Sequence, residues 1–337
     1  MTALRIYDED VEYELPPALA FTLGASRRCD VPVRGRDLSA RHCAFVRTGT
    51  QLRVYDQRST NGLFAAGRRV DAIDLYPGDT FTAPPLTFIA MNQEMRAARP
   101  LIADLIGAGA APTPDSVLID AVKLGHHLLI TGEAGCEMDR LARALHAVSL
   151  RRGRELIELA EPPGDRGAQR VILARAARST LLLRLELMKA PLDPTFCAMA
   201  FSPDRHVRVI ATAPSAAAAR RALGGATPPN LEQLGLRPLA LRTGELPALL
   251  DHLLAERGAG FGFAELAAPN REALRRHGWR DNFAGLRLTA DRLVAIGRVR
   301  DWEAMTWHER SAALGVPKTT LFDWFTSLGL AVPLLGA

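Results

Sequence analysis

A short segment near the middle of the chain has the residue types and spacing of a phosphate-binding loop. It reads Gly132-Glu-Ala-Gly-Cys-Glu-Met-Asp139, follows an apolar run at 128–130 and precedes a helix-type stretch at 141–146. A glycine turn between a buried strand and a helix can surround phosphate with backbone N–H groups, at the positive end of the helix dipole. The chemistry expected of such a loop is nucleotide binding and phosphoryl transfer.

The side chains of this segment do not suit that chemistry. The pattern G-x-x-x-x-G-K-[ST] keeps Gly132, and Gly135 follows in the turn, but the next pattern glycine is Glu137. Met138 stands where a lysine should reach the β- and γ-phosphates, and Asp139 where a hydroxyl should hold magnesium. Carboxylates repel phosphate. The segment therefore predicts a degenerate nucleotide loop with no catalytic residue.

The elements around the loop fall into blocks. Residues 1–92 combine short apolar runs with turn clusters such as 59–62 and 76–79, which predicts an all-β sandwich or barrel. Residues 93–100 are predicted to be a linker.

From residue 101 the pattern changes to strands that alternate with helices. A helix-type stretch at 168–177 separates two of the apolar runs. The runs that predict buried parallel strands are 128–130, 180–183 and 207–211. We therefore expect an α/β domain over 101–240, a helical lid over 241–298, and two helical stretches within 299–337.

The composition favours a soluble, cytoplasmic protein. Cys29, Cys43, Cys136 and Cys197 have neither metal-type spacing nor the density of a disulfide scaffold. The first residues are too acidic for a signal peptide, and no apolar run approaches the roughly 20 residues that span a bilayer. We expect no metal, no cofactor and no membrane partner. The formal net charge of +5 permits nucleic-acid contact, but scattered, solvated arginines explain it equally well.

Several short motifs of the first block keep a characteristic order and spacing. They are Leu23-Gly24, Cys29-Asp30-Val31, Leu38-Ser-Ala-Arg-His42, Asp56, Ser59-Thr-Asn-Gly62 and Pro77-Gly-Asp79. Along nearly the whole block they resemble a forkhead-associated (FHA) domain. The resemblance implies a β-sandwich whose loop tips hold phosphothreonine peptides, and hence a phosphothreonine-containing protein as partner.

The resemblance also implies roles for single residues. Ser39 matches the loop serine whose hydroxyl bonds the phosphate, and Arg41 lies at a variable but often basic position two residues on. Thr60 and Asn61 match the loop that holds the peptide backbone and the threonine methyl group. His42 matches a histidine that braces the loops.

One position departs from the family. Directly after the Leu-Gly pair the family has an arginine that clamps the phosphate, and this chain has Ala25. A charged hydrogen bond to phosphate contributes about 1.5–3 kcal/mol. Its loss is expected to weaken binding roughly tenfold to a hundredfold. Arg27 and Arg28 lie close enough in sequence to substitute. The alternative is a sandwich retained only as a docking surface.

Two further stretches extend the comparison to residues 100–295. Arg178-Ser-Thr-Leu-Leu-Leu-Arg-Leu185 and Trp279-Arg-Asp-Asn-Phe-Ala-Gly-Leu286 are similar to the Walker B strand and the lid motif of the AAA+ domain of sigma-54-dependent activators. By this resemblance the two Walker B acids fall on Arg184 and Leu185, and the sensor arginine falls on Ala284. The loop by which the family touches sigma-54 is absent.

These departures concern the charges that phosphoryl transfer needs together, namely a lysine, magnesium ligands and an arginine. The altered positions are Met138, Asp139, Arg184, Leu185 and Ala284. They predict a pseudo-ATPase, and residual nucleotide binding without hydrolysis stays open. The frame that remains can present surfaces to partners or support a homo-oligomer.

The stretch 310–330 resembles the Fis-type helix-turn-helix that ends these activators. The first residues of its second helix are the ones such a motif offers to the DNA major groove: Lys318, Thr319 and Thr320. Phe322 and Trp324 further along suit a protein interface as readily as DNA. A helical hairpin that packs on the lid or in a dimer is the alternative.

Together these expectations describe a non-catalytic, phosphothreonine-responsive transcriptional regulator. The rival is a scaffold that joins a phosphorylated partner to another assembly and binds no DNA. An active ATPase is disfavoured by the missing charges. Salt-dependent retardation of DNA would separate the first two functions.

Overall fold

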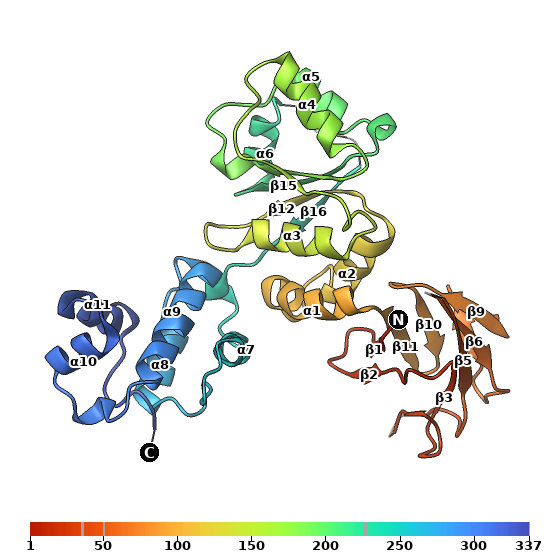
Figure 1. Cartoon of the computed structure of the whole chain (residues 1–337), viewed down its shortest axis with the longest axis horizontal. Coiled ribbons are helices and arrows are strands. Elements are labelled where there is room, and N and C mark those ends of the chain that lie inside the picture. Colours follow the sequence, from red (N-terminus) through yellow and green to blue (C-terminus); the bar gives the residue numbers. More distant parts are fainter. Residues whose placement is uncertain (35–36, 50, 226–227, 229, 337) are drawn as a thin grey trace.

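The computed structural model describes residues 1–34, 37–49, 51–225, 228 and 230–336. In Figure 1 the chain runs from a β-sandwich through a layer of helices to a parallel sheet, and it ends in a helical arm. The sandwich and the α/β layer confirm the arrangement predicted from the sequence. Within the described ranges, no helix is long and apolar enough to cross a membrane.

The N-terminal sandwich consists of two facing sheets. Their orders are β2-β1-β11-β10-β7-β8 and β4-β3-β5-β6-β9. The strands are β1 (Ala3–Ile6), β2 (Glu12–Glu14), β3 (Ala20–Gly24), β4 (Val31–Pro32), β5 (Cys43–Thr48), β6 (Gln51–Asp56), β7 (Leu63–Ala65), β8 (Arg68–Val70), β9 (Ala72–Leu75), β10 (Thr80–Ala83) and β11 (Leu86–Met91). Side chains alternate across them, so that in β6 Leu52 and Val54 are buried and Arg53 and Tyr55 are exposed.

Aromatic rings packed in stacked and edge-to-face pairs hold the two sheets together. Phe21 and Phe45 of one sheet lie 4.8 Å apart between ring centroids, and Phe45 meets Phe81 of the other sheet at 6.0 Å. Phe81 lies 5.2 Å from Phe88 on its own sheet. Because such rings bury a large apolar area in fixed geometry, the loops at the strand ends have a rigid base.

The segment 93–100, predicted to be a linker, is instead the first part of helix α1 (Gln93–Ile106). Asn92 begins the helix, since its side chain accepts a hydrogen bond from the Met95 N–H at 2.8 Å. Met95 opens a buried stripe that continues to the end of the helix and crosses Pro100. The linker prediction failed because a boundary at residue 100 divides this stripe into two pieces, each too short to show a helical period.

The α/β layer is a parallel sheet with helices around it. Its strand order is β13-β14-β15-β12-β16. The strands are β12 (His127–Thr131), β13 (Ile157–Leu159), β14 (Thr180–Arg184), β15 (Arg208–Ala213) and β16 (Leu231–Gly235). The helices are α2 (Pro114–Lys123), α3 (Met138–Val148), α4 (Arg166–Ala176), α5 (Pro194–Ala200) and α6 (Ala216–Ala222).

The degenerate loop lies at a reversal in this topology. It follows β12, which pairs with β15 on one side and β16 on the other. The chain then passes through α3 to β13 at the far edge of the sheet. In open α/β sheets the crevice at such a switch point, outside the carboxyl ends of the strands, is where ligands bind.

The helical arm contains a lid and a terminal hairpin. The lid helices are α7 (Leu246–Glu256), α8 (Ala268–Arg276) and α9 (Asn282–Gly297), and the hairpin helices are α10 (Trp307–Leu314) and α11 (Lys318–Leu328). Gly315, at a φ of 65°, ends α10 in the left-handed conformation that a tight turn requires. Trp324 of α11 lies under the Arg292 guanidinium of α9, 4.9 Å from ring centroid to Cζ. The hairpin therefore packs on the lid, as one of the sequence alternatives proposed.

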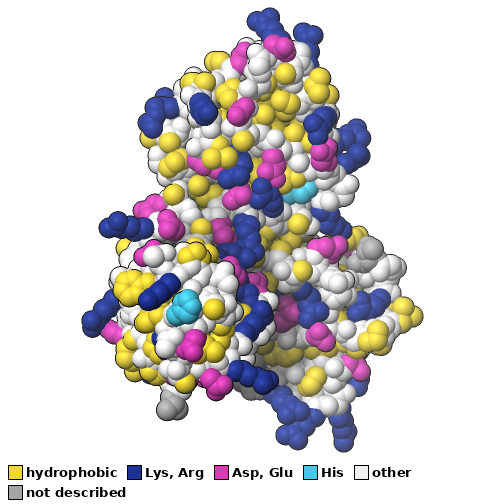
Figure 2. Space-filling view, turned by 60° about the vertical axis from the view of Figure 1, so that its left-hand side comes forward, with side chains coloured by type: hydrophobic (Ala, Val, Ile, Leu, Met, Phe, Trp, Pro, Cys, Tyr) yellow, Lys and Arg dark blue, Asp and Glu magenta, His cyan; other side chains and the backbone are white. Residues whose placement is uncertain are grey.

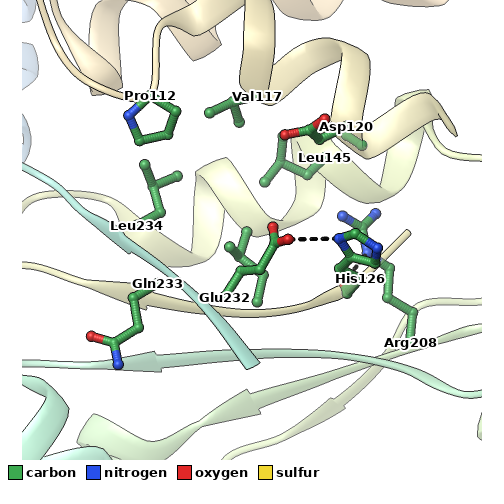
Figure 3. Close-up of a pocket in the computed structure, with 11 residues that line it drawn as sticks. Pro112, Val117, Asp120, His126, Leu145, Arg208, Glu232, Gln233 and Leu234 are labelled. Carbon is green, nitrogen blue, oxygen red and sulfur yellow. Dashed lines mark hydrogen bonds and ion pairs between the residues drawn. The ribbon is translucent and has the colours of Figure 1, made fainter. Parts of the chain in front are cut away.

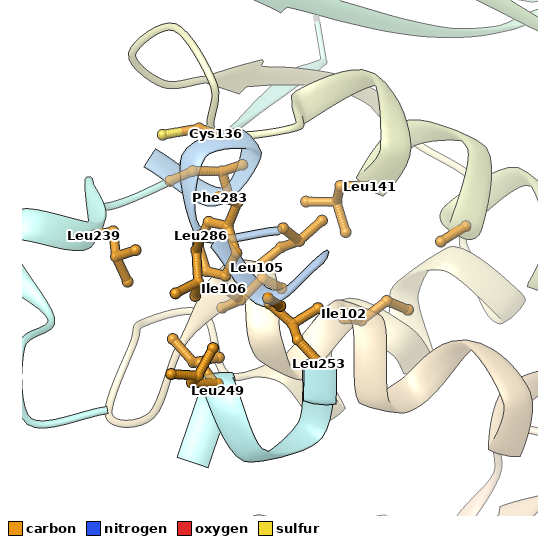
Figure 4. Packing of buried hydrophobic residues seen from close by; sticks show 14 of the residues in the cluster. Ile102, Leu105, Ile106, Cys136, Leu141, Leu239, Leu249, Leu253, Phe283 and Leu286 are labelled. Carbon is orange, nitrogen blue, oxygen red and sulfur yellow. The ribbon is translucent and has the colours of Figure 1, made fainter. Parts of the chain in front are cut away.

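The lid joins the α/β layer through one continuous core. Figure 4 shows α1, α7 and α9 converging below the degenerate loop. The buried side chains drawn there include Ile102, Leu105, Ile106, Cys136, Leu141, Leu239, Leu249, Leu253, Phe283 and Leu286. This shared core fixes the lid against the sheet.

A buried ion cluster joins the sandwich to the α/β layer. Asp115, at the start of α2, has no exposed surface. Its carboxylate accepts hydrogen bonds from Arg5 Nε at 3.2 Å, Arg99 Nε at 3.0 Å and the Asp8 N–H at 2.9 Å. Because these groups come from β1, the turn after it and α1, the cluster holds the sandwich in one orientation on the helices.

Candidate functional site

Two loops meet at one end of the sandwich through Ser39 and Thr60. The Ser39 hydroxyl accepts a hydrogen bond from the Thr60 N–H at 2.9 Å and lies 3.4 Å from the Thr60 hydroxyl. Thr60 is exposed and Ser39 is half-buried. The structure therefore brings together two residues that the sequence assigned to one site, and both face solvent at the loop tips.

His42 braces this junction from below. The buried imidazole lies with Nε2 3.0 Å from the Gly62 carbonyl and accepts a hydrogen bond from the Ser39 N–H at Nδ1, at 3.4 Å. With Nδ1 as acceptor, Nε2 carries the proton and donates to Gly62. Gly24 completes the packing, because a Cβ there would lie 2.5 Å from the Ala40 carbonyl oxygen. The loops are thus held before any peptide arrives.

Asn61 lies beside Thr60 on the second loop and is exposed. Its Nδ2 donates long hydrogen bonds to the Asp37 carbonyl at 3.4 Å and the Pro84 carbonyl at 3.3 Å. Bonds of this length are weak. The Asn61 amide can therefore exchange them for hydrogen bonds to a peptide with little loss of free energy.

The arginines that the sequence singled out lie around these loops. Arg27 and Arg28 occupy the centre of a turn in which the Cys29 N–H bonds to the Ser26 carbonyl, and both are exposed. Within the described residues, neither side chain bonds to Ser39 or Thr60. Ala25 packs against the sandwich core. Replacement of the missing clamp by Arg27 or Arg28 therefore stays a prediction.

Arg41 is exposed and lies near Asp30. The pKa of Asp30 is lowered first by hydrogen bonds from the Thr22 backbone and hydroxyl, at 2.8 and 2.9 Å, and further by the Arg41 charge. Since Thr22 already holds the carboxylate, the Arg41 guanidinium stays available to another anion.

Sequence reasoning missed Arg69 of β8. Its guanidinium lies against the backbone of Gly62, where an added Cβ would be 2.6 Å from Arg69 Nε. Gly62 also has a φ of +81°. Both the left-handed backbone and the close approach of Arg69 therefore favour glycine at this position. The cross-strand pairing of Arg69 with Phe64 is what aims the arginine at this loop, and no motif in the sequence indicated that pairing.

In the degenerate loop, the side chain at the lysine position points into the core. Met138 is only 7% exposed and packs with Leu141 and Leu145 of α3. Glu137 precedes α3 with a φ of 56° and makes no capping hydrogen bond with its side chain. The helix end that would receive phosphate is thus flanked by an apolar group and a carboxylate.

Arginines already hold two of the three carboxylates of the loop, Glu137 and Asp139. Glu137 is bound by Arg140 Nη1 at 2.8 Å and lies 3.4 Å from Arg287 Nε of the lid. Asp139 is bound by Arg143 Nη1 at 2.7 Å. The charges of Glu137 and Asp139, which would repel a nucleotide, are therefore neutralised within the protein.

Arg143 extends this network to the next strand. It binds Glu158 through two hydrogen bonds, from Nε and Nη2, each 2.8 Å long. The bond from Arg143 lowers the pKa of Glu158. A bidentate pair of this kind has a fixed geometry.

A second arginine stands at the end of β14. Arg184 Nη1 lies 3.7 Å from Asp139, and its Nε lies 3.2 Å from Glu186. Glu186 also accepts a hydrogen bond from the Thr212 hydroxyl at 2.7 Å. The resemblance implies an acid at position 184 and a hydroxyl at position 139, both around magnesium. This chain has Arg184 and Asp139 there, and the two side chains are in contact. Sequence reasoning missed Glu186, which directly follows the stretch 178–185, and Thr212, which directly follows the apolar run 207–211.

The lid closes directly over the loop. The Ala284 N–H donates to the Gly135 carbonyl at 3.1 Å, and Asn282 Nδ2 donates to the Ala134 carbonyl at 2.8 Å. Gly135 has a φ of +79°, and a Cβ there would lie 2.1 Å from the Asp281 carbonyl oxygen. A lid arginine does reach the loop, but it is Arg287, one helical turn after Ala284.

A separate small cavity lies between α2, α3 and the sheet, beside the amino ends of the strands and thus at the opposite end of the sheet from the degenerate loop. Figure 3 shows Asp120, His126, Arg208 and Glu232 around it, with His126 Nδ1 2.7 Å from Glu232. Burial lowers the pKa of Arg208 to about 10 and raises that of Asp120. With a volume of only about 50 Å³, this cavity is too small for a nucleotide.

The predicted DNA-contacting residues lie at the start of α11. Lys318 and Thr319 are exposed, and Thr320 is half-buried. Over residues 299–337 the basic side chains are Arg300, Arg310 and Lys318, against the four acids Asp301, Glu303, Glu309 and Asp323.

One of these three basic side chains is not displayed on the surface. Arg310 is buried, with Nε bonded to the Trp302 carbonyl at 2.9 Å. In Figure 2 this end of the molecule comes forward, and its surface mixes hydrophobic, acidic and basic side chains without a continuous basic area.

Two further results bear on ligands. Among the residues that the structure describes, no cluster of His, Cys, Asp or Glu could hold a metal ion. The four cysteines are free and buried, and burial raises the pKa of Cys136 and Cys197 to about 11. Thiols with so high a pKa are poor nucleophiles at neutral pH.

Residues 21–83 match the family model of the FHA domain, so the N-terminal sandwich is an FHA domain. Among solved structures, the chain is similar to the FHA domain of the CT664 protein from Chlamydia trachomatis, with 16% identity over 27% of this chain and 95% of that one and a TM-score of 0.25. Mycobacterium tuberculosis EmbR in complex with a low-affinity phosphopeptide shares 26% identity over 27% of this chain and 24% of that one, with a TM-score of 0.25. NtrX from Brucella abortus in complex with ATP shares 16% identity over 72% of this chain and 69% of that one, with a TM-score of 0.42. No curated protein matches the sequence.

Proposed function

We propose that this protein is a non-catalytic adaptor that reads phosphothreonine on a partner protein. One observation carries the proposal: an FHA domain presents the Ser39 hydroxyl and the Thr60–Asn61 loop on a braced rim. The degenerate loop supports the non-catalytic part, since Asp139 is paired with Arg143 and Arg184 and the lid donates hydrogen bonds to the loop carbonyls.

The proposed binding uses groups that need little rearrangement. A phosphate oxygen accepts the Ser39 O–H, which among the described residues donates only in the 3.4 Å contact with the Thr60 hydroxyl. The Asn61 amide leaves its two long bonds and donates to the peptide backbone. Because the loops are already braced, little ordering entropy opposes binding.

Changes at the phosphate position should alter affinity in opposite directions. Ser39→Ala removes a hydrogen bond to a dianion and is expected to weaken binding of a phosphothreonine peptide about tenfold. Ala25→Arg adds a charged donor and is expected to tighten binding about tenfold to a hundredfold. Fluorescence anisotropy with the full chain measures both, and Thr48→Ala at the other end of β5 serves as the control. Equal affinities of the wild type and the three variants would mean that the peptide does not bind at Ser39 and Ala25.

The chain should not hydrolyse ATP. Neither Met138 nor Arg184 can replace the charges that position the γ-phosphate and magnesium. Phosphate release with Mg-ATP is expected to equal that of a mock purification. Turnover above that blank that disappears in Glu186→Gln would assign catalysis to the carboxylate beside β14 and overturn the non-catalytic proposal.

A DNA-binding transcriptional regulator is the second candidate, because α11 exposes Lys318 and Thr319 at its start. The excess of acidic over basic side chains in 299–337 weakens this candidate, since phosphate contacts supply most DNA affinity. The adaptor is therefore the better-supported function.

If the protein does bind DNA, Lys318→Glu should weaken binding more than any other single change in α11. It should also make the slope of log affinity against log salt shallower by roughly one unit. Anisotropy on promoter DNA at low salt, with Lys189→Glu in the α/β layer as control, measures both effects. If the folded wild-type protein does not bind DNA, the adaptor is the only one of the two candidate functions that remains.

A further inference from the structure

The rim around Ser39 and Thr60 carries a group of exposed arginines. They are Arg27, Arg28, Arg41, Arg58 and Arg69. In the part of the chain that the structure describes, none of them forms an ion pair with a carboxylate. Two acids at this end of the sandwich are held by other groups, since Asp30 accepts from the Thr22 hydroxyl and Asp56 accepts from the Ser59 hydroxyl at 2.6 Å. On the strands the arrangement differs, and Arg53 pairs with Asp74 at 3.4 Å.

Two of these arginines lie at the two loops of the site. The backbone on either side of Arg41 lies against the end of β3, since the Ser26 N–H donates to the Ala40 carbonyl at 3.0 Å and the His42 N–H donates to the Leu23 carbonyl at 2.9 Å. Arg69 belongs to β8, an edge strand of the sheet that faces β3, and β8 runs through Asp71 directly into β9. Arg41 thus belongs to the loop of Ser39, and Arg69 lies against Gly62 in the loop of Thr60, so each of the two loops that meet at the Ser39–Thr60 junction carries one of these arginines.

This placement suits a ligand with more negative charge than one phosphate. Guanidinium groups that lack a carboxylate partner create a positive potential that attracts anions and can form forked hydrogen bonds with carboxylate or phosphate. The absent clamp at Ala25 leaves the central phosphate with fewer charged contacts. Charges beside the phosphothreonine would then supply a larger share of the affinity.

We propose that the site selects phosphothreonine peptides that carry anionic side chains on both flanks, with Arg41 and Arg69 as the residues that determine this specificity. The anionic groups are carboxylates or a second phosphate, which share the same chemistry. The proposal rests on the proposed function and specifies the partner of the same site.

The test compares peptides that differ only beside the phosphothreonine. Full-length protein is titrated with peptides whose flanks are alanine, aspartate on one side, aspartate on the other, aspartate on both, or a second phosphothreonine. Each acidic flank is expected to tighten binding about two- to fivefold, the range of an exposed ion pair. The gain should shrink as salt rises. A gain from the second phosphate but not from aspartate would identify a doubly phosphorylated partner.

Single substitutions show which arginine causes the gain in affinity from each acidic flank. Arg69→Gln should abolish the gain from one flank and Arg41→Gln the gain from the other, while Arg53→Gln should change neither. Equal binding of neutral and acidic peptides, or a gain that survives both variants, would overturn this inference and leave phosphothreonine reading intact. Failure of every phosphothreonine peptide to bind the folded protein would overturn the proposed function as well.

Discussion

Replacing Asp115 with alanine should lower the free energy of unfolding by about 3–5 kcal/mol, the range for breaking a buried ion pair from one side. Asp115 is fully buried, and Arg5, only 4% exposed, would lose its carboxylate partner there. Arg99 and the Asp8 N–H would lose the same acceptor. Urea denaturation of the full chain, followed by circular dichroism, measures the change.

The matched control is Asp74→Ala, which breaks the exposed pair with Arg53. An exposed pair of this kind contributes at most about 1 kcal/mol. The argument also predicts that Asp115→Ala loosens the sandwich from the helices, so that a protease cleaves around residues 92–115 sooner. If both variants lose the same small amount of stability, the cluster does not hold the sandwich in place.

The second large effect is expected from Gly135→Ala in the degenerate loop. The added Cβ would meet the Asp281 carbonyl oxygen at 2.1 Å, and backbone at a φ of +79° disfavours alanine. The left-handed conformation costs about 1–2 kcal/mol and the overlap about 1–3 kcal/mol more. Relief requires the start of α9 to move away, which breaks the bonds from Asn282 and Ala284 to the loop.

Gly109→Ala separates these two causes. Gly109 has a φ of +65° and nothing within 4 Å of an added Cβ, so only the conformational cost applies. Hydrogen exchange should rise at the first turn of α9 in Gly135→Ala and stay unchanged in Gly109→Ala. Equal stability losses in both variants would mean that the lid does not rest on the loop.

The sequence predicted the elements with a clear local pattern. The apolar runs at 128–130 and 180–183 are the centres of β12 and β14, because strands covered on both faces are apolar throughout. The sandwich followed from the motifs between residues 23 and 79, which supply its turns. The helix α1 was missed, since its apolar stripe crosses an assumed boundary.

The candidate site was predicted in part, for a related reason. Ser39 and Thr60 could be paired from their motifs, and the structure joins them at 2.9 Å. Arg69 could not be placed, because its position depends on the register between β7 and β8. The partners of Glu137 were equally hidden, since Arg287 reaches it only when the lid folds over the loop. Local patterns indicate which residues line a loop, whereas charges brought from other elements depend on the tertiary fold.

The most direct test of the central claim is calorimetric titration of the full chain with a phosphothreonine peptide, with and without Mg-ATP. Phosphoserine and unmodified versions of the peptide complete the series. We predict saturable binding of the phosphothreonine peptide alone, with the same Kd whether nucleotide is present or absent. Equal binding of the unmodified peptide would contradict phosphothreonine reading. A Kd that changes with Mg-ATP would contradict the claim that the α/β layer acts without nucleotide.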